Sequence, residues 1–156
     1  MRDRLASLLL GLVSVGLIGS VFCARGLERT DTVVPSDPAD FASSLEAMIA
    51  AHGTGREAEG LPVIRPPAGD VYLMAERWRF YPALELEAGR HYRLHVASAD
   101  VVHSLVLDGR DRLLIPGEVT RVDVVASPEL GLPQCAEFCG NGHYKMKGAI
   151  SVVTPQ

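Results

Sequence analysis

Residues 91–97 read HYRLHVA, and apolar and polar side chains alternate along them. Tyr92, Leu94 and Val96 fall on one face of an extended chain, and the intervening polar residues fall on the other. A period of two is typical of a β-strand with one buried face. The stretch therefore predicts a strand in a sheet that covers a core.

Further short stretches of this kind lie on both sides of residues 91–97, separated by turn-forming pairs such as Ala88-Gly89, Asp108-Gly109 and Pro116-Gly117. About seven strands at this spacing favour a β-sandwich or a Greek-key barrel. We therefore expect a mainly β domain over residues 71–156. The other expected strands lie near residues 71–75, 78–81, 83–87, 102–107, 119–125 and 150–153.

The segment before this domain, residues 27–70, is rich in proline, glycine, aspartate and alanine. Within it, Ser36-Asp37-Pro38 resembles a helix start, and His52-Gly53 resembles a helix stop. These signals predict a short amphipathic helix over about residues 38–51, whose apolar stripe we expect to pack on a partner or on the membrane surface. Residues 53–70 predict a linker.

The N-terminal segment, residues 1–26, contains twenty uncharged residues from Leu5 to Ala24. At about 1.5 Å per residue, a helix of this length spans about 30 Å, the thickness of the hydrocarbon core of a bilayer. It predicts a single transmembrane anchor. The alternative is a cleaved signal peptide, whose apolar region is usually shorter.

Composition excludes several classes of protein. The chain has 156 residues, with 15 basic and 19 acidic side chains and a net charge of −4. This balance does not fit a nucleic-acid-binding protein, which needs a basic surface. Three cysteines are too few for a disulfide-rich secreted scaffold.

The chemistry is concentrated in residues 133–146, which read PQCAEFCGNGHYKM. Thiols at Cys135 and Cys139 are followed by the imidazole of His143 and the thioether of Met146, and His103 lies upstream. Soft sulfur donors combined with imidazoles favour copper. A second thiolate beyond the single one of a blue-copper site makes a two-copper centre possible, with a backbone carbonyl of the loop as a further weak ligand.

Two other interpretations of the cysteine pair remain. Cys135 and Cys139 could form a disulfide, as in many exported domains. They could also bind zinc together with His103 and His143. Met146 serves neither a disulfide nor a zinc site, so its position favours copper.

At these positions the sequence resembles a known family. The pattern C-A-E-F-C-G-x-G-H-x-x-M, with D-V-V-H-S upstream, is similar to the dinuclear copper (CuA) domain of subunit II of haem–copper cytochrome c oxidases, in its single-helix, B-type-like form. The resemblance implies a cupredoxin-like Greek-key barrel. It also implies the copper ligands His103, Cys135, Glu137 through its backbone carbonyl, Cys139, His143 and Met146.

The same resemblance implies a role as part of an enzyme complex, with no catalytic residue on this chain. Such a subunit receives electrons from cytochrome c and passes them to haem in subunit I, where oxygen is reduced. Its copper domain faces the outer or periplasmic side of the cytoplasmic membrane. The alternative function is a membrane-anchored CuA electron carrier, or a copper-handling protein, outside an oxidase.

Two further expectations concern Trp78 and the stretch 112–117. Trp78 resembles the tryptophan through which electrons enter in the family, but a packed core residue is an equal interpretation. The stretch 112–117 has no acidic residue before Pro116-Gly117, where relatives with a magnesium site have an aspartate. We therefore expect no magnesium site there.

Overall fold

A computed structural model of the chain describes residues 31–155. The anchor expected within residues 1–26 lies outside the described residues. Among residues 31–155, no helix has both the length and the apolar character needed to cross a bilayer. The prediction of a mainly β chain is confirmed, since the described part consists of strands β1–β11, one α-helix and two short 3-10 helices.

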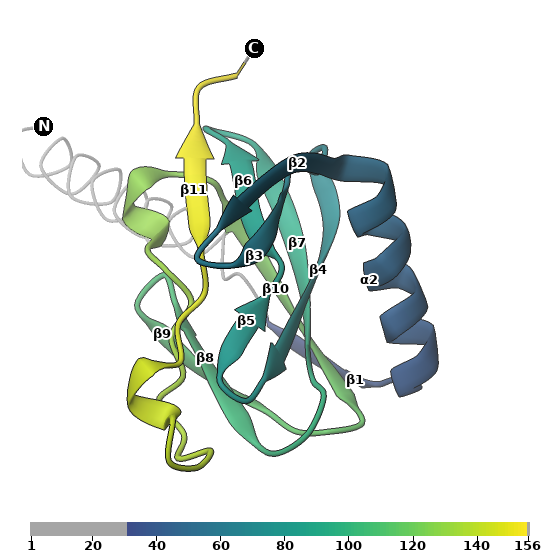
Figure 1. The fold of residues 1–156 in the computed structure, drawn as a ribbon, viewed down its shortest axis with the longest axis vertical. Coiled ribbons are helices and arrows are strands. Elements are labelled where there is room, and N and C mark those ends of the chain that lie inside the picture. The colour runs from purple at the N-terminus through teal and green to yellow at the C-terminus, as the bar shows by residue number, and fades with distance from the viewer. Residues whose placement is uncertain (1–30, 156) are drawn as a thin grey trace, which may run out of the picture. The chain divides into compact units, whose positions relative to one another are not determined.

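The larger sheet contains five strands in the order β1-β10-β7-β4-β5 (Figure 1). Strand β7 lies at its centre, antiparallel to β10 and parallel to β4. The side chains of Tyr92, Leu94 and Val96 are buried, as the alternation in residues 91–97 predicts. The bounds of the strands are β1 (Thr32–Pro35), β4 (Gly69–Glu76), β5 (Arg79–Tyr81), β7 (His91–Ser98) and β10 (Glu118–Val125).

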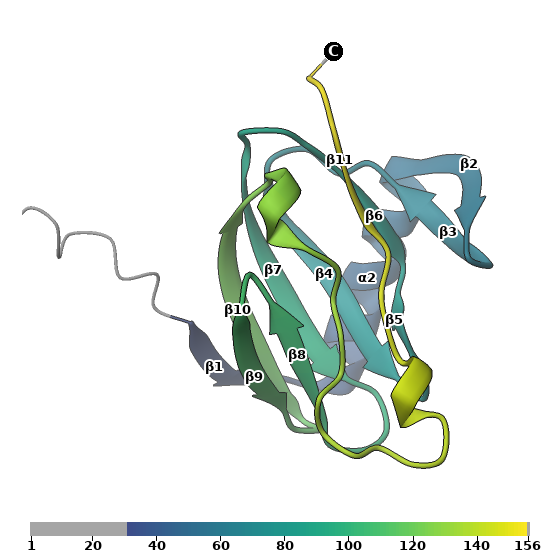
Figure 2. The ribbon, with the colours of Figure 1, turned by 90° about the vertical axis from the view of Figure 1, so that its left-hand side faces the viewer.

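A second sheet of four strands, in the order β11-β6-β3-β2, faces the first across a shared apolar core (Figure 2). A separate hairpin, β8-β9, adds its own apolar side chains to that core. The bounds are β2 (Gly53–Ala58), β3 (Leu61–Ile64), β6 (Ala83–Glu87), β8 (His103–Leu107), β9 (Arg110–Leu114) and β11 (Ile150–Val153).

The linker predicted over residues 53–70 is wrong for much of its length. Strands β2 and β3 form an antiparallel hairpin there, and β3 pairs in parallel with β6. Leu61, Val63 and Ile64 are buried, so this segment contributes apolar surface to the fold. Because β1 also joins the larger sheet, the compact unit begins at Asp31, well before residue 71.

A buried carboxylate attaches this hairpin to β6. Glu85 is paired with Arg56 of β2 at 2.6 Å and with Arg65, which follows β3. The hydrogen bond from Arg56 lowers the pKa of Glu85, although burial alone would raise it, and Arg65 acts in the same direction as Arg56. An ionised carboxylate in this position is satisfied by two cations, which suits its burial.

The helix expected over about residues 38–51 is present as α2 (Pro38–His52). Asp37 caps it, since its side chain accepts a hydrogen bond from the Ala39 N–H at 2.8 Å. The expected partner of its apolar stripe was wrong. Phe41 packs edge-on against Tyr72 of β4, with ring centroids 5.6 Å apart, so the helix covers the chain's own sheet.

A buried arginine connects the start of the domain to the β8-β9 hairpin. Arg112 donates from Nε to Asp31 at 2.7 Å and from Nη1 to Asp108 at 3.0 Å. Its Nη1 also contacts the carbonyl of Leu107 at 3.0 Å. The guanidinium thus joins the β8-β9 hairpin to Asp31, which lies 81 residues before Arg112 in the sequence.

Candidate metal centre

The chain between η1 (Pro128–Leu130) and β11 folds back along β8 as a long loop that includes η2 (His143–Lys145). In Figure 2 the loop runs down from η1 to the lower end of the sandwich, where η2 lies. Gln134 bridges to both Val106 and Lys147. The Cys135 N–H donates to the Met146 carbonyl at 3.2 Å, so the two ends of the motif are joined.

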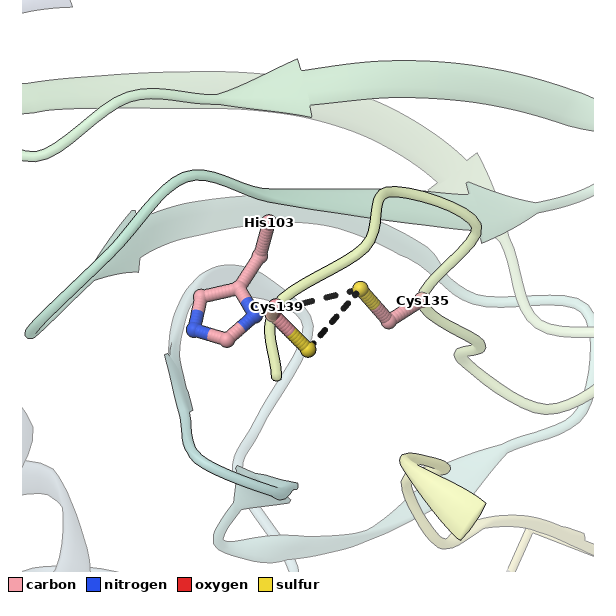
Figure 3. Close-up of side chains that lie close together, drawn as sticks. All are labelled: His103, Cys135 and Cys139. Atoms are coloured by element: carbon pink, nitrogen blue, oxygen red, sulfur yellow. Dashed lines mark hydrogen bonds between the residues drawn. The ribbon is translucent and has the colours of Figure 1, made fainter. Parts of the chain in front are cut away.

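Two sulfur atoms form the middle of this region. The Sγ atoms of Cys135 and Cys139 are 3.9 Å apart, and both cysteines are free thiols. One ligand atom from each of these residues and one from His103 lie within 4.8 Å of one another (Figure 3). The residues therefore form a compact cluster of metal-binding atoms, brought together from the start of β8 and from the loop.

Each sulfur has one imidazole and one weaker donor nearby. Cys135 Sγ lies 3.8 Å from His103 Nδ1 and 3.2 Å from the Glu137 carbonyl oxygen. Cys139 Sγ lies 3.7 Å from His143 Nδ1 and 3.6 Å from Met146 Sδ. The structure thus gathers all six donors that the sequence singled out. Soft sulfur donors beside imidazoles suit a soft metal ion such as copper.

The imidazole of His103 is oriented by a carboxylate. His103 is fully buried, and its Nε2 lies 2.8 Å from Asp100 Oδ1. Burial by itself would raise the pKa of Asp100, but hydrogen bonds from His103, the Val101 N–H and Arg77 lower it to about 2. An ionised Asp100 accepts a hydrogen bond from the N–H at Nε2, which leaves the lone pair of Nδ1 facing Cys135. Metal-binding histidines in proteins commonly have such a carboxylate partner.

The two thiols must lose their protons before they can bind a metal ion. Burial, followed by the charge of the neighbouring Cys135, raises the pKa of the Cys139 thiol to about 11. Without a metal, this sulfur is protonated at neutral pH. Two adjacent thiolates repel each other, and a soft cation between them removes that repulsion and releases protons. The donor set therefore fits copper.

Trp78 contacts the loop from the β4-β5 turn. Its indole N–H donates to the carbonyl of Cys139 at 3.3 Å, and 37% of the residue is exposed. The ring lies against Gly140 and Gly142, and Lys145 Nζ is 5.8 Å from the ring centroid. Trp78 thus connects the surface with the backbone of a cysteine of the cluster, and it is not a fully packed core residue.

Sequence reasoning missed three supporting residues. Asp100 and Gly142 stand in the quoted motif but were given no role there, and Arg77 lies outside the motif. The one available signal was the i,i+3 spacing of Asp100 and His103 just before a predicted strand. Arg77 could not be found in this way, because its backbone N–H and Nε reach Asp100 across 23 residues of sequence.

We expect Gly142→Ala to destabilise the protein by about 1–3 kcal/mol, the usual cost of overpacking. The backbone at Gly142 has φ −96°, which alanine adopts without strain, so the cost comes from space alone. An added Cβ would lie 2.2 Å from Cδ2 of Trp78 and would displace the indole. Thermal unfolding measures the loss. In a Trp78→Ala background the same change should cost little, and an equal loss in both backgrounds would contradict the clash.

The chain was compared with protein-family models, curated proteins and solved structures. No protein-family model and no curated protein matches the sequence. Among solved structures, a chain of a haem–copper terminal oxidase dimer is 23% identical, covers 97% of this chain and 99% of its own, and has a TM-score of 0.55.

Two further structures show lower TM-scores. The periplasmic domain of cytochrome oxidase subunit II of Bradyrhizobium japonicum is 23% identical, covers 55% of this chain and 83% of its own, and scores 0.48. Rusticyanin of Thiobacillus ferrooxidans is 13% identical, covers 82% of this chain and 100% of its own, and also scores 0.48.

The likeness to the oxidase chain shows the fold. The expectation of a mainly β, cupredoxin-like chain is thereby confirmed for the described residues. In fold the chain resembles a chain of a haem–copper terminal oxidase, and the spacing of its sequence motif resembles that of oxidase subunit II.

Proposed function

We propose that this chain is subunit II of a haem–copper terminal oxidase. In this role it accepts electrons from cytochrome c or a similar soluble donor and passes them to haem in subunit I, where oxygen is reduced. The observation that carries the proposal is the pair of free sulfurs 3.9 Å apart, each with an imidazole nitrogen and a weaker donor within 4 Å. The likeness in fold to an oxidase chain supports it.

Six residues would hold the dinuclear copper centre. Cys135 and Cys139 would bridge the metals, and His103 and His143 would each supply an imidazole. Met146 and the backbone carbonyl of Glu137 would be weak outer ligands. When bound, such a centre takes up and gives back one electron.

The chain's own side chains prepare this site for rapid electron transfer. Cys139, Met146 and His103 are buried, which keeps water away from the donors. Asp100 holds His103 in one tautomer, and the Ser104 hydroxyl fixes the loop by accepting the Ala136 N–H at 2.8 Å. Because these contacts hold the donor side chains in place, the side chains move little when the charge of the site changes. The reorganisation energy of electron transfer is therefore small.

Trp78 is proposed as the point of electron entry. Its exposed edge can meet a donor, while its N–H contacts the backbone of Cys139. The membrane anchor within residues 1–26 and the outer or periplasmic position of the copper domain are parts of the same proposal.

We expect the copper-loaded chain to contain two coppers per chain and to be purple, with one unpaired electron shared by both metals. The paired sulfurs with balanced flanking donors are the reason. Metal analysis combined with electron paramagnetic resonance measures both properties. A single copper per chain with a blue-copper spectrum would contradict the dinuclear site.

Purification of the tagged full chain from its native membranes tests the complex. Haem that co-purifies in a fixed ratio to the chain is the result expected of an oxidase subunit. A copper-loaded chain that purifies without haem under mild conditions would instead indicate a membrane-anchored CuA carrier.

A further inference from the structure

The exposed surface around Trp78 is rich in cations. Arg77 and Arg79 flank it in sequence, and about half of each side chain is exposed (49% and 52%). Lys145 reaches the indole ring from the loop, with Nζ 5.8 Å from the ring centroid. We call Trp78 and these three cations the tryptophan patch.

The carboxylates beside the tryptophan patch are already neutralised. Asp100 is paired with Arg77 at 2.9 Å, and its other oxygen is used by His103. Glu76 is paired with Arg79. Within the described residues, Lys145 has the indole ring as its recorded neighbour and forms no ion pair. The same pairs also neutralise Arg77 and Arg79, so three cations against these two carboxylates give the patch a net charge of +1, which Lys145 supplies.

The positive charge of the tryptophan patch is opposite in sign to the net charge of the domain. Residues 31–155 contain 17 acidic and 11 basic side chains, a net charge of −6. A uniform distribution would make every face negative, so the cations around Trp78 form a local exception. Clefts and patches of one sign raise the local concentration of partners of the other sign and speed their association.

Exposed aromatic side chains come from the same loop. Phe138 is 72% exposed and Tyr144 is 82% exposed, and the Phe138 ring lies 6.1 Å from that of His143. Aromatic residues and arginine are enriched in protein–protein interfaces. The loop end of the domain thus combines the composition of an interface with a positive charge.

We propose that the tryptophan patch docks a soluble redox protein whose own redox group is surrounded by carboxylates. The proposal rests on the proposed function, since it names the kind of donor that this site serves. Carboxylates on the donor complement Arg77, Arg79 and Lys145, whereas a donor with a lysine-rich docking face is repelled. Such complementarity sets the association rate and the choice of partner more than the final affinity.

Small charged oxidants test the sign of the local field on the copper-loaded full chain in neutral detergent. The reduced chain gives one electron to hexacyanoferrate(III), an anion, or to tris(phenanthroline)cobalt(III), a cation. Near a positive patch, the rate with the anion falls as salt is added, by about tenfold, and the rate with the cation rises. The net charge of the chain alone predicts the reverse, and that result would overturn the proposal.

Charge-reversal variants locate the effect. Arg79→Glu combined with Lys145→Glu should remove or invert the salt dependence while the copper spectrum is unchanged. Arg90→Glu is the matched control, because Arg90 is 59% exposed in the turn between β6 and β7, at the other end of the sandwich. If Arg90→Glu changes the salt dependence of the rates as much as the double variant does, the tryptophan patch does not set the local electrostatic potential.

Protein donors then test the partner itself. At low salt, a reduced cytochrome c of net negative charge should transfer electrons to the chain faster than one of net positive charge and similar potential. The double variant should lose this preference. Faster transfer from the positive cytochrome would overturn the proposal, as would loss of haem co-purification in the double variant, since the patch would then face subunit I. A chain that binds no copper would overturn the proposed function itself, which separates the two failures.

Discussion

Cys135→Ser is expected to abolish the two-copper centre. The serine oxygen is a hard donor that stays protonated at neutral pH, so it cannot replace a bridging thiolate. Only Cys139 would then link the metals, and His103 and the Glu137 carbonyl would lose the sulfur that lies between 3 and 4 Å from each of them. Copper content should fall to one per chain or less, and the shared-spin signal should disappear.

The control for this variant is the third cysteine. Cys23 lies outside the described residues, within the predicted anchor, and Cys23→Ser should leave the copper content and the spectrum unchanged. Cys139→Ser should reproduce the loss seen with Cys135→Ser. Two coppers and a shared spin in a folded Cys135→Ser protein would show that Cys135 is not a bridging ligand.

Trp78→Ala should slow electron uptake from the donor by orders of magnitude and leave the copper spectrum intact. The reason is that the indole fills the space between the surface and the Cys139 carbonyl, and alanine leaves a gap there. The same variant also loses stability. If Trp78 were fully buried, the truncation would lower the free energy of unfolding by about 3–5 kcal/mol. Since more than a third of Trp78 is exposed, we expect about 2 kcal/mol. Stopped-flow reduction and thermal unfolding of the same variant measure the two effects.

Trp78→Phe separates packing from the route of the electron. Phenylalanine keeps an aromatic ring against Gly140 and Gly142 but cannot donate to Cys139. An uptake rate between those of the parent and the alanine variant, with near-parent stability, is the expected result. If Trp78→Ala is stably folded and takes up electrons at the parent rate, Trp78 is not on the pathway.

The clustering of the proposed metal ligands and the central strands could be predicted from sequence because their signals are local. Alternation in residues 91–97 requires only neighbouring positions, and β7 (His91–Ser98) follows it closely. Cys135, Cys139, His143 and Met146 lie within one loop, where donor type and spacing already limit the chemistry. His103 was identified because it stands in D-V-V-H-S, the upstream stretch that takes part in the family resemblance.

The features that were missed depend on contacts between distant segments. The β2-β3 hairpin is rich in glycine, proline and charge, which is typical of a linker, and its place in the sheet depends on Glu85 some 20 residues further on. The apolar stripe of α2 was correctly located, but sequence could not say that Tyr72 would cover it. Likewise, the connection from His103 through Asp100 to Arg77 exists only after the chain has folded.

The salt bridge between Arg112 and Asp31 has a mechanical consequence. Asp31 is where the chain enters the domain, and Arg112 belongs to the strand paired with β8, whose first residue is His103. A pull on the chain before residue 31 is therefore shared between the β1-β10 ladder and the β8-β9 hairpin. In the proposed anchored chain, tension at Asp31 would reach the proposed ligand His103 through a single side chain and a short hairpin.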